Sequence, residues 1–193
     1  MKKGEESRQR LILCAAELFW KNGYSATGIS EILKQAELPK GSFYFYFKSK
    51  DELAIAVTEY YQKMILEYFQ NNSIGKSLED FINEIFDYLL GSTKGQHFAG
   101  CPYAVMGMET ALSKPDVADA FMNGLKKMEH LFYQVLLYSG LPQDHAEILA
   151  ERMLSLYQGE LLLGRISNDT SYLGEAKTNM IEMYREYRTY HGI

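Results

Sequence analysis

Apolar residues recur every three to four positions along nearly the whole chain, and no stretch alternates steadily between apolar and polar residues. The first spacing places side chains on one face of an α-helix, whereas steady alternation is typical of strands. We therefore predict an all-α fold of about nine helices, over residues 5–22, 27–36, 40–47, 49–71, 77–90, 102–112, 115–138, 143–166 and 171–188.

Residues that start or end helices set the boundaries in the first third of the chain. Gly23 is placed to end the first helix in a left-handed conformation, and Thr27 is predicted to cap the second. Pro39 then interrupts the pattern before a very short third segment. Ser49 followed three residues later by Glu52 is a capping box, which predicts that the long fourth helix starts there.

A helix, a tight turn and a very short helix in front of a long helix form the pattern of a helix-turn-helix head. We accordingly predict two domains, a DNA-binding head over residues 1–48 and a second helical domain over residues 49–193. The charge is divided in the same way. The net charge is −5, yet residues 1–50 carry nine Lys and Arg against five acids, a balance of +4. This asymmetry concentrates attraction for phosphate at one end of the chain.

Five consecutive aromatic residues, Phe43 to Phe47, occupy the short third segment and cannot all face the core. Phe43 and Phe47 are four apart and are predicted to pack inward, with Phe45 also in the core. Tyr44 and Tyr46 then point outward, where their hydroxyls can reach phosphate oxygens.

Polar residues surround this aromatic run. Lys48 and Lys50 follow it and add donors for phosphate. Lys40, Ser42 and Phe43 are placed to touch base edges or a thymine methyl group. The basic residues Lys2, Lys3, Arg8 and Arg10 are expected to form an arm that adds salt-sensitive, non-specific attraction.

The first 50 residues closely resemble the DNA-binding signature of the TetR family, at Leu11–Phe19, Gly23-Tyr24, Thr27, Ile32, Ala36, Gly41, Tyr44, Tyr46-Phe47, Lys48-Ser49-Lys50 and Leu53. The resemblance implies a homodimer whose recognition helices enter successive major grooves of double-stranded, pseudo-palindromic operator DNA, under control of a small-molecule effector. By position it implies that Thr27 caps the second helix and touches phosphate, and that Tyr44 and Lys50 contact phosphate. It places base reading at Lys40, Gly41, Ser42 and Phe43. Pro39 departs from the family, which often has Ser or Thr before the recognition helix.

The second part of the chain is similar to the LmrA/YxaF-type subgroup at Gly100-Cys101-Pro102, Ala104, Met108, Glu109 and Ala111. The resemblance implies that the helical domain over residues 49–193 serves ligand binding and dimerisation, and the family's dimers usually join through their last two helices. That implies an interface formed by apolar stripes on the last two predicted helices: Leu149, Met153, Leu156 and Leu161, with Met180, Met183, Tyr184 and Tyr187. The same stripes also suit an ordinary core within one chain, and the spacing alone does not separate the two.

Methionine and aromatic residues are frequent in the same part of the chain. Such side chains suit a pocket for flat, hydrophobic ligands, as well as an ordinary core. The predicted pocket residues are Tyr60, Met64, Phe86, Tyr103, Met106, Phe121, Met122, Tyr133 and Tyr157.

Other classes of function find little support in the sequence. His97 and Cys101 are two ligands without further partners, so we predict no metal site and no cofactor. No Cys/His, Ser/His or Glu-x-x-His arrangement predicts an enzyme. No apolar run approaches a membrane span and the start lacks a signal-peptide core, so we expect a cytoplasmic protein without membrane contact.

The predicted function is a transcriptional repressor that releases its operator when a small hydrophobic ligand binds. The alternative is a ligand-independent architectural or division-linked DNA-binding factor.

Overall fold

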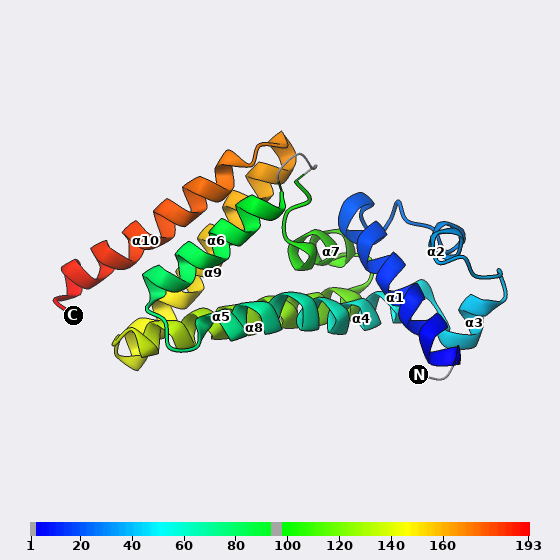
Figure 1. Ribbon diagram of the computed structural model, residues 1–193, viewed down its shortest axis with the longest axis horizontal. Helices are drawn as coiled ribbons and strands as arrows, with labels where there is room; N and C mark the ends of the chain where they lie inside the picture. Colours follow the sequence, from blue (N-terminus) through cyan, green and yellow to red (C-terminus); the bar gives the residue numbers. More distant parts are fainter. Residues whose placement is uncertain (1–2, 94–97) are drawn as a thin grey trace. The chain divides into compact units, whose positions relative to one another are not determined.

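The computed structural model describes residues 3–93 and 98–193, and within these ranges it contains helices and no strand (Figure 1). The all-α prediction is confirmed. Lys2 and His97 lie outside the described residues. No helix in the described part of the chain is long and apolar enough to cross a membrane. The helices are α1 (Lys3–Asn22), α2 (Ile29–Gln35), α3 (Ser42–Tyr46), α4 (Lys50–Tyr61), a π-helical turn (Gln62–Leu66), α5 (Glu67–Ser73), α6 (Leu78–Ser92), α7 (Pro102–Thr110), α8 (Pro115–Tyr138), α9 (Gln143–Ser167) and α10 (Ser171–His191).

The predicted helix over residues 49–71 is the one element that the structure divides. Its first part is α4, which Ser49 caps by accepting a hydrogen bond from the Glu52 backbone N–H at 3.1 Å. The Glu52 carboxylate accepts from the backbone N–H of Lys48 at 2.7 Å, so the reciprocal half of the capping box is shifted by one residue. The π-helical turn then separates α4 from α5, which raises the number of α-helices above the nine predicted.

The chain folds into two compact units. Unit 1 takes in the chain up to Ile65 together with Pro102–Gly124, and unit 2 takes in Leu66–Cys101 and Leu125–Ile193, each as far as the structure describes them. The predicted boundary after residue 48 therefore does not coincide with the division into units, because α4, α7 and the start of α8 pack with the first three helices. The assignment of functions to residues 1–48 and 49–193 stays a prediction.

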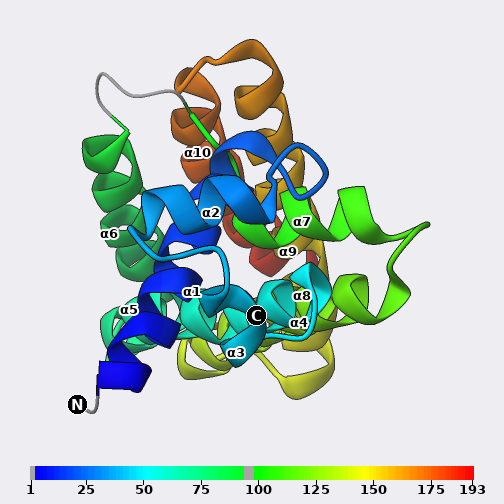
Figure 2. The same ribbon diagram turned by 90° about the vertical axis from the view of Figure 1, so that its right-hand side faces the viewer.

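Unit 1 is built around α1, which packs against α2, α4 and α7 (Figure 2). The buried residues of α1 include Leu11, Ala15 and Phe19, the face expected from the spacing. A cluster of three buried rings, Tyr61, Tyr103 and Phe121, joins α4 to α7 and α8, with ring centroids 5.9 to 6.4 Å apart. The Tyr61 hydroxyl donates to the Ala16 carbonyl at 2.6 Å and so ties this cluster to α1.

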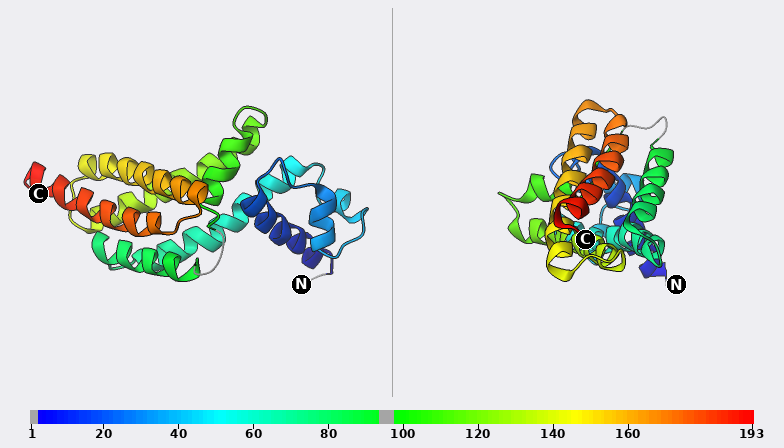
Figure 3. Two further views of the ribbon diagram at one scale, coloured as in Figure 1. Left: turned by 90° about the horizontal axis from the view of Figure 1, so that it is seen from above. Right: turned by 90° about the vertical axis from the view of Figure 1, so that its left-hand side faces the viewer.

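Unit 2 is dominated by α9 and α10, which lie side by side, with α10 also packed against α6 (Figures 1 and 3). Six of the eight residues predicted for a dimer interface are buried inside this unit: Leu149, Met153, Leu161, Met180, Tyr184 and Tyr187. Leu156 and Met183 are half-buried. The prediction was wrong for the six buried residues, because the two stripes cover each other and α6 within one chain, as the alternative reading allowed.

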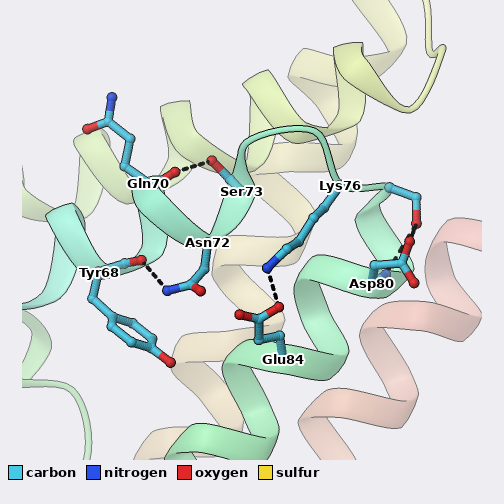
Figure 4. Close-up of polar contacts among 8 residues, drawn as sticks. Tyr68, Gln70, Asn72, Ser73, Lys76, Asp80 and Glu84 are labelled. Carbon is cyan, nitrogen blue, oxygen red and sulfur yellow. Dashed lines mark hydrogen bonds and ion pairs between the residues drawn. The ribbon is translucent and has the colours of Figure 1, made fainter.

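The connection from α5 to α6 shows how polar side chains end one helix and start the next (Figure 4). The side chains of Asn72 and Ser73 each donate to a backbone carbonyl of the preceding turn at 2.8 Å. Ser77 caps α6 by accepting from the Asp80 backbone N–H at 3.2 Å. Lys76, in the turn itself, forms an ion pair with Glu84 of α6.

Candidate nucleic-acid interface

The turn between α2 and α3 sets the direction of α3 relative to α2. Glu37 adopts a left-handed conformation with φ of 54°, and the Leu38 N–H donates to the Leu33 carbonyl at 3.0 Å. The Ser42 N–H donates to the carbonyl of Pro39 at 2.9 Å, which forms the first turn of α3 without a capping side chain. Pro39 is compatible with this entry because its carbonyl, rather than a side-chain oxygen, accepts the bond.

Two rings fix α3 to the rest of unit 1. Phe43 and Phe47 are buried, their ring centroids lie 6.0 Å apart, and the Arg8 guanidinium lies 5.1 Å from the Phe47 ring. Their inward packing is confirmed. The prediction for Phe45 was wrong, because a helix that turns Phe43 and Phe47 inward must turn the residue between them outward, and Phe45 is 80% exposed.

The outer side of α3 carries hydrogen-bond donors. Tyr44 is 70% exposed, Lys40 and Lys48 are exposed on either side of the helix, and Ser42 and Tyr46 are half-buried. Phe43, predicted to touch bases, has no surface to do so. The face that α3 presents to solvent therefore has Phe45 where Phe43 was predicted, and it combines aromatic surface with hydroxyl and ammonium donors.

Thr27 does not cap α2, which corrects the sequence prediction. The N-cap residue is Gly28, and no side chain bonds to the free N–H groups there. The Thr27 side chain is buried, and its hydroxyl donates back to the Gly23 carbonyl at 2.8 Å. The residue closes the turn between α1 and α2 instead of facing solvent.

Lys50 reaches into the same turn. Its ammonium donates to the carbonyls of Tyr24 at 2.9 Å and Thr27 at 3.1 Å, and it lies 4.1 Å from the centroid of the Tyr24 ring. Burial lowers the pKa of this lysine, partly against the raising influence of Asp51. Two of its donors are thus used within the chain, which makes Lys50 a brace for the turn.

Two acidic residues hold the other side of the turn, and sequence reasoning missed both. The Glu109 carboxylate of α7 accepts from the Ser25 backbone N–H at 3.0 Å. It lies so close to Gly23, whose φ is +90°, that a Cβ there would overlap it. Asp51 accepts from the Tyr24 hydroxyl and pairs with the Lys114 ammonium at 2.8 Å. Glu109 and Lys114 lie 84 and 63 residues from their partners, so no local pattern could have indicated these contacts.

The residues predicted to line one ligand pocket divide between the two units. In unit 1, Tyr103, Met106 and Phe121 are buried, Tyr60 is half-buried, and Met64 and Met122 are exposed. In unit 2, Phe86 and Tyr157 are buried, and Tyr133 is half-buried. Tyr103, Phe121, Phe86 and Tyr157 are members of packed ring clusters, which is the ordinary core reading of these residues.

The residue that directly follows a member of the aromatic cluster in unit 2 has a buried polar atom. The Tyr157 ring packs against Phe86 and Phe132, with centroids 5.9 and 6.3 Å away, and its burial raises the pKa of the Tyr157 hydroxyl. The next residue, Gln158, has a side-chain oxygen that is buried without a hydrogen-bond partner among the described residues, while its amide nitrogen lies 4.0 Å from the Met128 sulfur. Buried polar atoms are almost always hydrogen-bonded, so this oxygen requires an explanation.

The geometry of α1 to α3, with a short third helix anchored by two rings and exposing donors outward, defines a helix-turn-helix DNA-binding head. The family described as bacterial regulatory proteins, tetR family, matches residues 11–57. The family described as transcriptional regulator LmrA/YxaF-like, C-terminal domain, matches residues 75–179. The chain therefore belongs to the TetR family of transcriptional regulators, with a DNA-binding N-terminal domain and an LmrA/YxaF-like C-terminal domain.

Individual relatives agree with this assignment. The chain is 29% identical to the uncharacterized HTH-type transcriptional regulator YxaF of Bacillus subtilis over 87% of its own length and 90% of the relative's. It is 26% identical to the HTH-type transcriptional repressor NemR of Escherichia coli over 89% and 90%. The crystal structure of regulatory protein TetR from Rhodobacter sphaeroides superposes with a TM-score of 0.82 at 24% identity, covering 90% of this chain and 96% of that one, a likeness of fold.

The ion pair at Asp51 makes the stability of the head depend on pH. Hydrogen bonds from Lys114 and Tyr24 hold the pKa of Asp51 below its ordinary value, so the folded state prefers the ionised carboxylate. This contribution is complete above the unfolded pKa of about 3.9 and is lost as the pH falls through the lower folded pKa. Asp51→Asn should therefore lower the free energy of unfolding at pH 7 by ~0.5–1 kcal/mol, a modest value because the pair is partly exposed to solvent.

Urea denaturation of wild type and variant between pH 7 and pH 2.5 measures this difference. The two stabilities should converge as the pH falls below about 4. Asp119→Asn, at an exposed position of α8, is the matched control and should show no such convergence. A stability difference that stays constant over the whole pH range would contradict the assigned role of Asp51.

Proposed function

We propose that the protein is a repressor that binds a pseudo-palindromic operator as a homodimer and releases it when a small, largely apolar effector binds unit 2. The observation that carries the DNA-binding part is the outer side of α3, where Tyr44, Lys40 and Lys48 stand exposed around a helix fixed by two buried rings. Fixed donors of this kind contact phosphates and set the register of a recognition helix in the major groove.

The proposed DNA contacts differ in part from those expected from the family resemblance. Tyr44 and Lys48 remain as phosphate contacts, with Tyr46 beside them. Lys40, expected at base edges, is proposed here as a further phosphate contact, and Gly41 and Ser42 remain at the start of the recognition helix. Thr27 and Phe43 drop out because their side chains are buried. Lys50 acts chiefly by holding the α1–α2 turn, since its ammonium already bonds two carbonyls there.

Removal of a phosphate-binding side chain should weaken DNA binding and reduce its salt dependence. In a fluorescence anisotropy titration with the duplex upstream of the gene, Tyr44→Ala should lower affinity about tenfold or more, because hydrogen bonds to charged groups contribute ~1.5–3 kcal/mol. Lys48→Ala should also reduce the slope of log K against log salt by ~0.9 for each phosphate that the variant no longer neutralises.

Lys126→Ala, an exposed lysine of unit 2, is the control and should leave both affinity and slope unchanged. If wild type shows no binding to the upstream duplex or to any duplex recovered from a random-sequence selection, the proposed function is wrong. If Tyr44→Ala and Lys48→Ala both bind DNA as tightly as wild type, α3 is not the DNA-binding surface.

The outer face of α9 is the surface proposed for dimerisation. Opposite its buried face, α9 exposes Leu162, Leu163 (48%) and Ile166 (74%), and Gly159 is exposed among them. A Cβ at Gly159 would meet no described atom within 4 Å, so the glycine leaves space there for a second helix to approach. A second copy of the chain is the proposed occupant, since TetR-family regulators typically bind operators as dimers.

Charge placed in this stripe should separate the protomers. Leu163→Glu combined with Ile166→Glu should convert the dimer to a monomer in sedimentation velocity, because each buried Leu or Ile side chain contributes ~1.5–3 kcal/mol to association. Ile74→Glu, at an apolar position that is 75% exposed elsewhere in unit 2, should leave the dimer intact. A double variant that sediments as wild type would exclude this face, and a wild-type monomer would exclude the dimer.

The effector proposal rests on the buried oxygen of Gln158, which has no hydrogen-bond partner among the described residues. A buried oxygen acceptor in a largely apolar interior suits an uncharged ligand with one hydroxyl or N–H donor on an apolar body. The Met128 side chain, whose sulfur lies 4.0 Å from the Gln158 amide nitrogen, is flexible and can change rotamer to make room for such a ligand. Among the relatives, NemR is named a repressor, which supports repression as the proposed role of this chain.

A panel of uncharged phenols and aliphatic alcohols tests this proposal. At least one member should weaken operator binding tenfold or more, which requires a difference of ~1.4 kcal/mol between the two conformations. Gln158→Leu should keep operator affinity but lose the response, whereas Gln134→Leu, at an exposed position of α8, should retain it. Operator binding that no member changes would favour the ligand-independent DNA-binding factor.

A further inference from the structure

Phe45 is the outermost residue of α3. At ~100° per residue, it lies about 160° around the helix axis from both Phe43 and Phe47, so it points away from the two rings that anchor the helix. Its side chain is 80% exposed, more than that of the neighbouring Tyr44. Within unit 1 the folding of α3 therefore gains little from a phenyl ring at this position, since a polar side chain would be equally compatible with exposure.

Gly41 lies one turn before Phe45, on the same side of the helix. It is exposed, its φ of −72° is open to any residue, and a Cβ there would meet no described atom within 4 Å. Neither backbone conformation nor packing within the chain thus requires a glycine. The missing side chain leaves a gap next to the Phe45 ring, where another molecule can approach the helix backbone closely.

Donors for phosphate surround this apolar ring and gap. Tyr44 precedes Phe45, Lys40 precedes Gly41, and Lys48 follows the helix, all of them exposed. The Phe45 ring stands edge-on to Tyr46, with centroids 4.9 Å apart and planes at 86°. In the major groove, the base-edge group that matches an apolar ring is the C5-methyl group of thymine.

We propose that Phe45 selects thymine at one position of each operator half-site by packing against its methyl group, with Gly41 giving the room for this approach. The proposal rests on the DNA binding proposed above and adds to it the residue that discriminates between bases. It assigns a base-reading role to the most exposed ring of α3, where the sequence alone had indicated Phe43.

A methyl-deletion scan tests the proposal with the full-length protein. A duplex recovered by random-sequence selection with wild type is synthesised with each thymine replaced singly by deoxyuridine, which removes only the methyl group. Wild type should lose about fourfold in affinity at one thymine per half-site, the value expected for one buried methyl group. Phe45→Ala should bind the parent duplex more weakly and respond equally to uracil and thymine at that position.

Two further variants separate this role from a general loss of binding. Tyr44→Ala should weaken binding to every duplex yet keep the wild-type loss at the same thymine. Phe45→Leu, which keeps an apolar side chain, should restore part of the thymine preference. Thermal melts should be unchanged in Phe45→Ala because the ring is exposed.

The results also separate this proposal from the proposed function. A wild type that binds its selected duplex but loses nothing at any deoxyuridine overturns the role of Phe45 and leaves DNA binding intact. The same conclusion follows if Phe45→Ala keeps the full wild-type uracil profile. If selection recovers no binding sequence, DNA binding itself fails, and the role of Phe45 fails with it.

Discussion

A helix of five residues has almost no stability of its own, because its first turn fixes several backbone dihedrals in return for one hydrogen bond. α3 therefore depends on the burial of Phe43 and Phe47, which fixes both its position and its rotation about its own axis. Once these two rings are buried, the directions of the other side chains of the helix are fixed. Phe45 must point outward, and Tyr44 and Tyr46 lie to either side of it. The contacts that we propose with DNA are consequences of this rotation, so the two buried phenylalanines determine which side chains the head can present.

The turn between α1 and α2 is the second constraint on the head, and it is met by residues distant in sequence. Lys50 of α4 donates hydrogen bonds to two backbone carbonyls of this turn, and Glu109 of α7 accepts a hydrogen bond from a backbone N–H of the turn. Asp51 links the Tyr24 hydroxyl to Lys114 just before α8. A displacement of α7 within unit 1 would have to break these contacts or carry the turn with it. Glu109 and Lys114 therefore link the segment Pro102–Gly124 to the turn that precedes α2.

Sequence patterns predicted the helices well because their boundaries depend on local chemistry. Pro115 and the Gly140–Pro142 turn delimit α8 at the residues expected. The side-chain roles were harder to predict wherever tertiary packing decides them. Five adjacent aromatics leave the rotation of a short helix open, so Phe45 was placed in the core. Thr27 has the chemistry of an N-cap, but a buried hydroxyl that bonds the preceding turn competes with that role and prevails here. The contacts of Glu109 and Lys114 with residues 84 and 63 positions away had no local sequence signal.

The apolar stripes of α9 show a second limit of prediction from periodicity. This limit concerns the surface through which two copies of the chain would associate. Periodicity identified Leu149, Met153 and Leu161 as one apolar face, and that face is buried within the chain. The same helix carries Leu163 and Ile166 on the opposite side, so its second half has apolar residues on two opposite faces. An exposed apolar face on a helix is typical of a surface that another helix covers. One chain covers only one of the two faces in the structure, and α10, whose outer side is largely polar, does not reach the other. The remaining face has the composition of a surface that a second copy covers, which is why the dimer proposed here uses the residues that periodicity had left out.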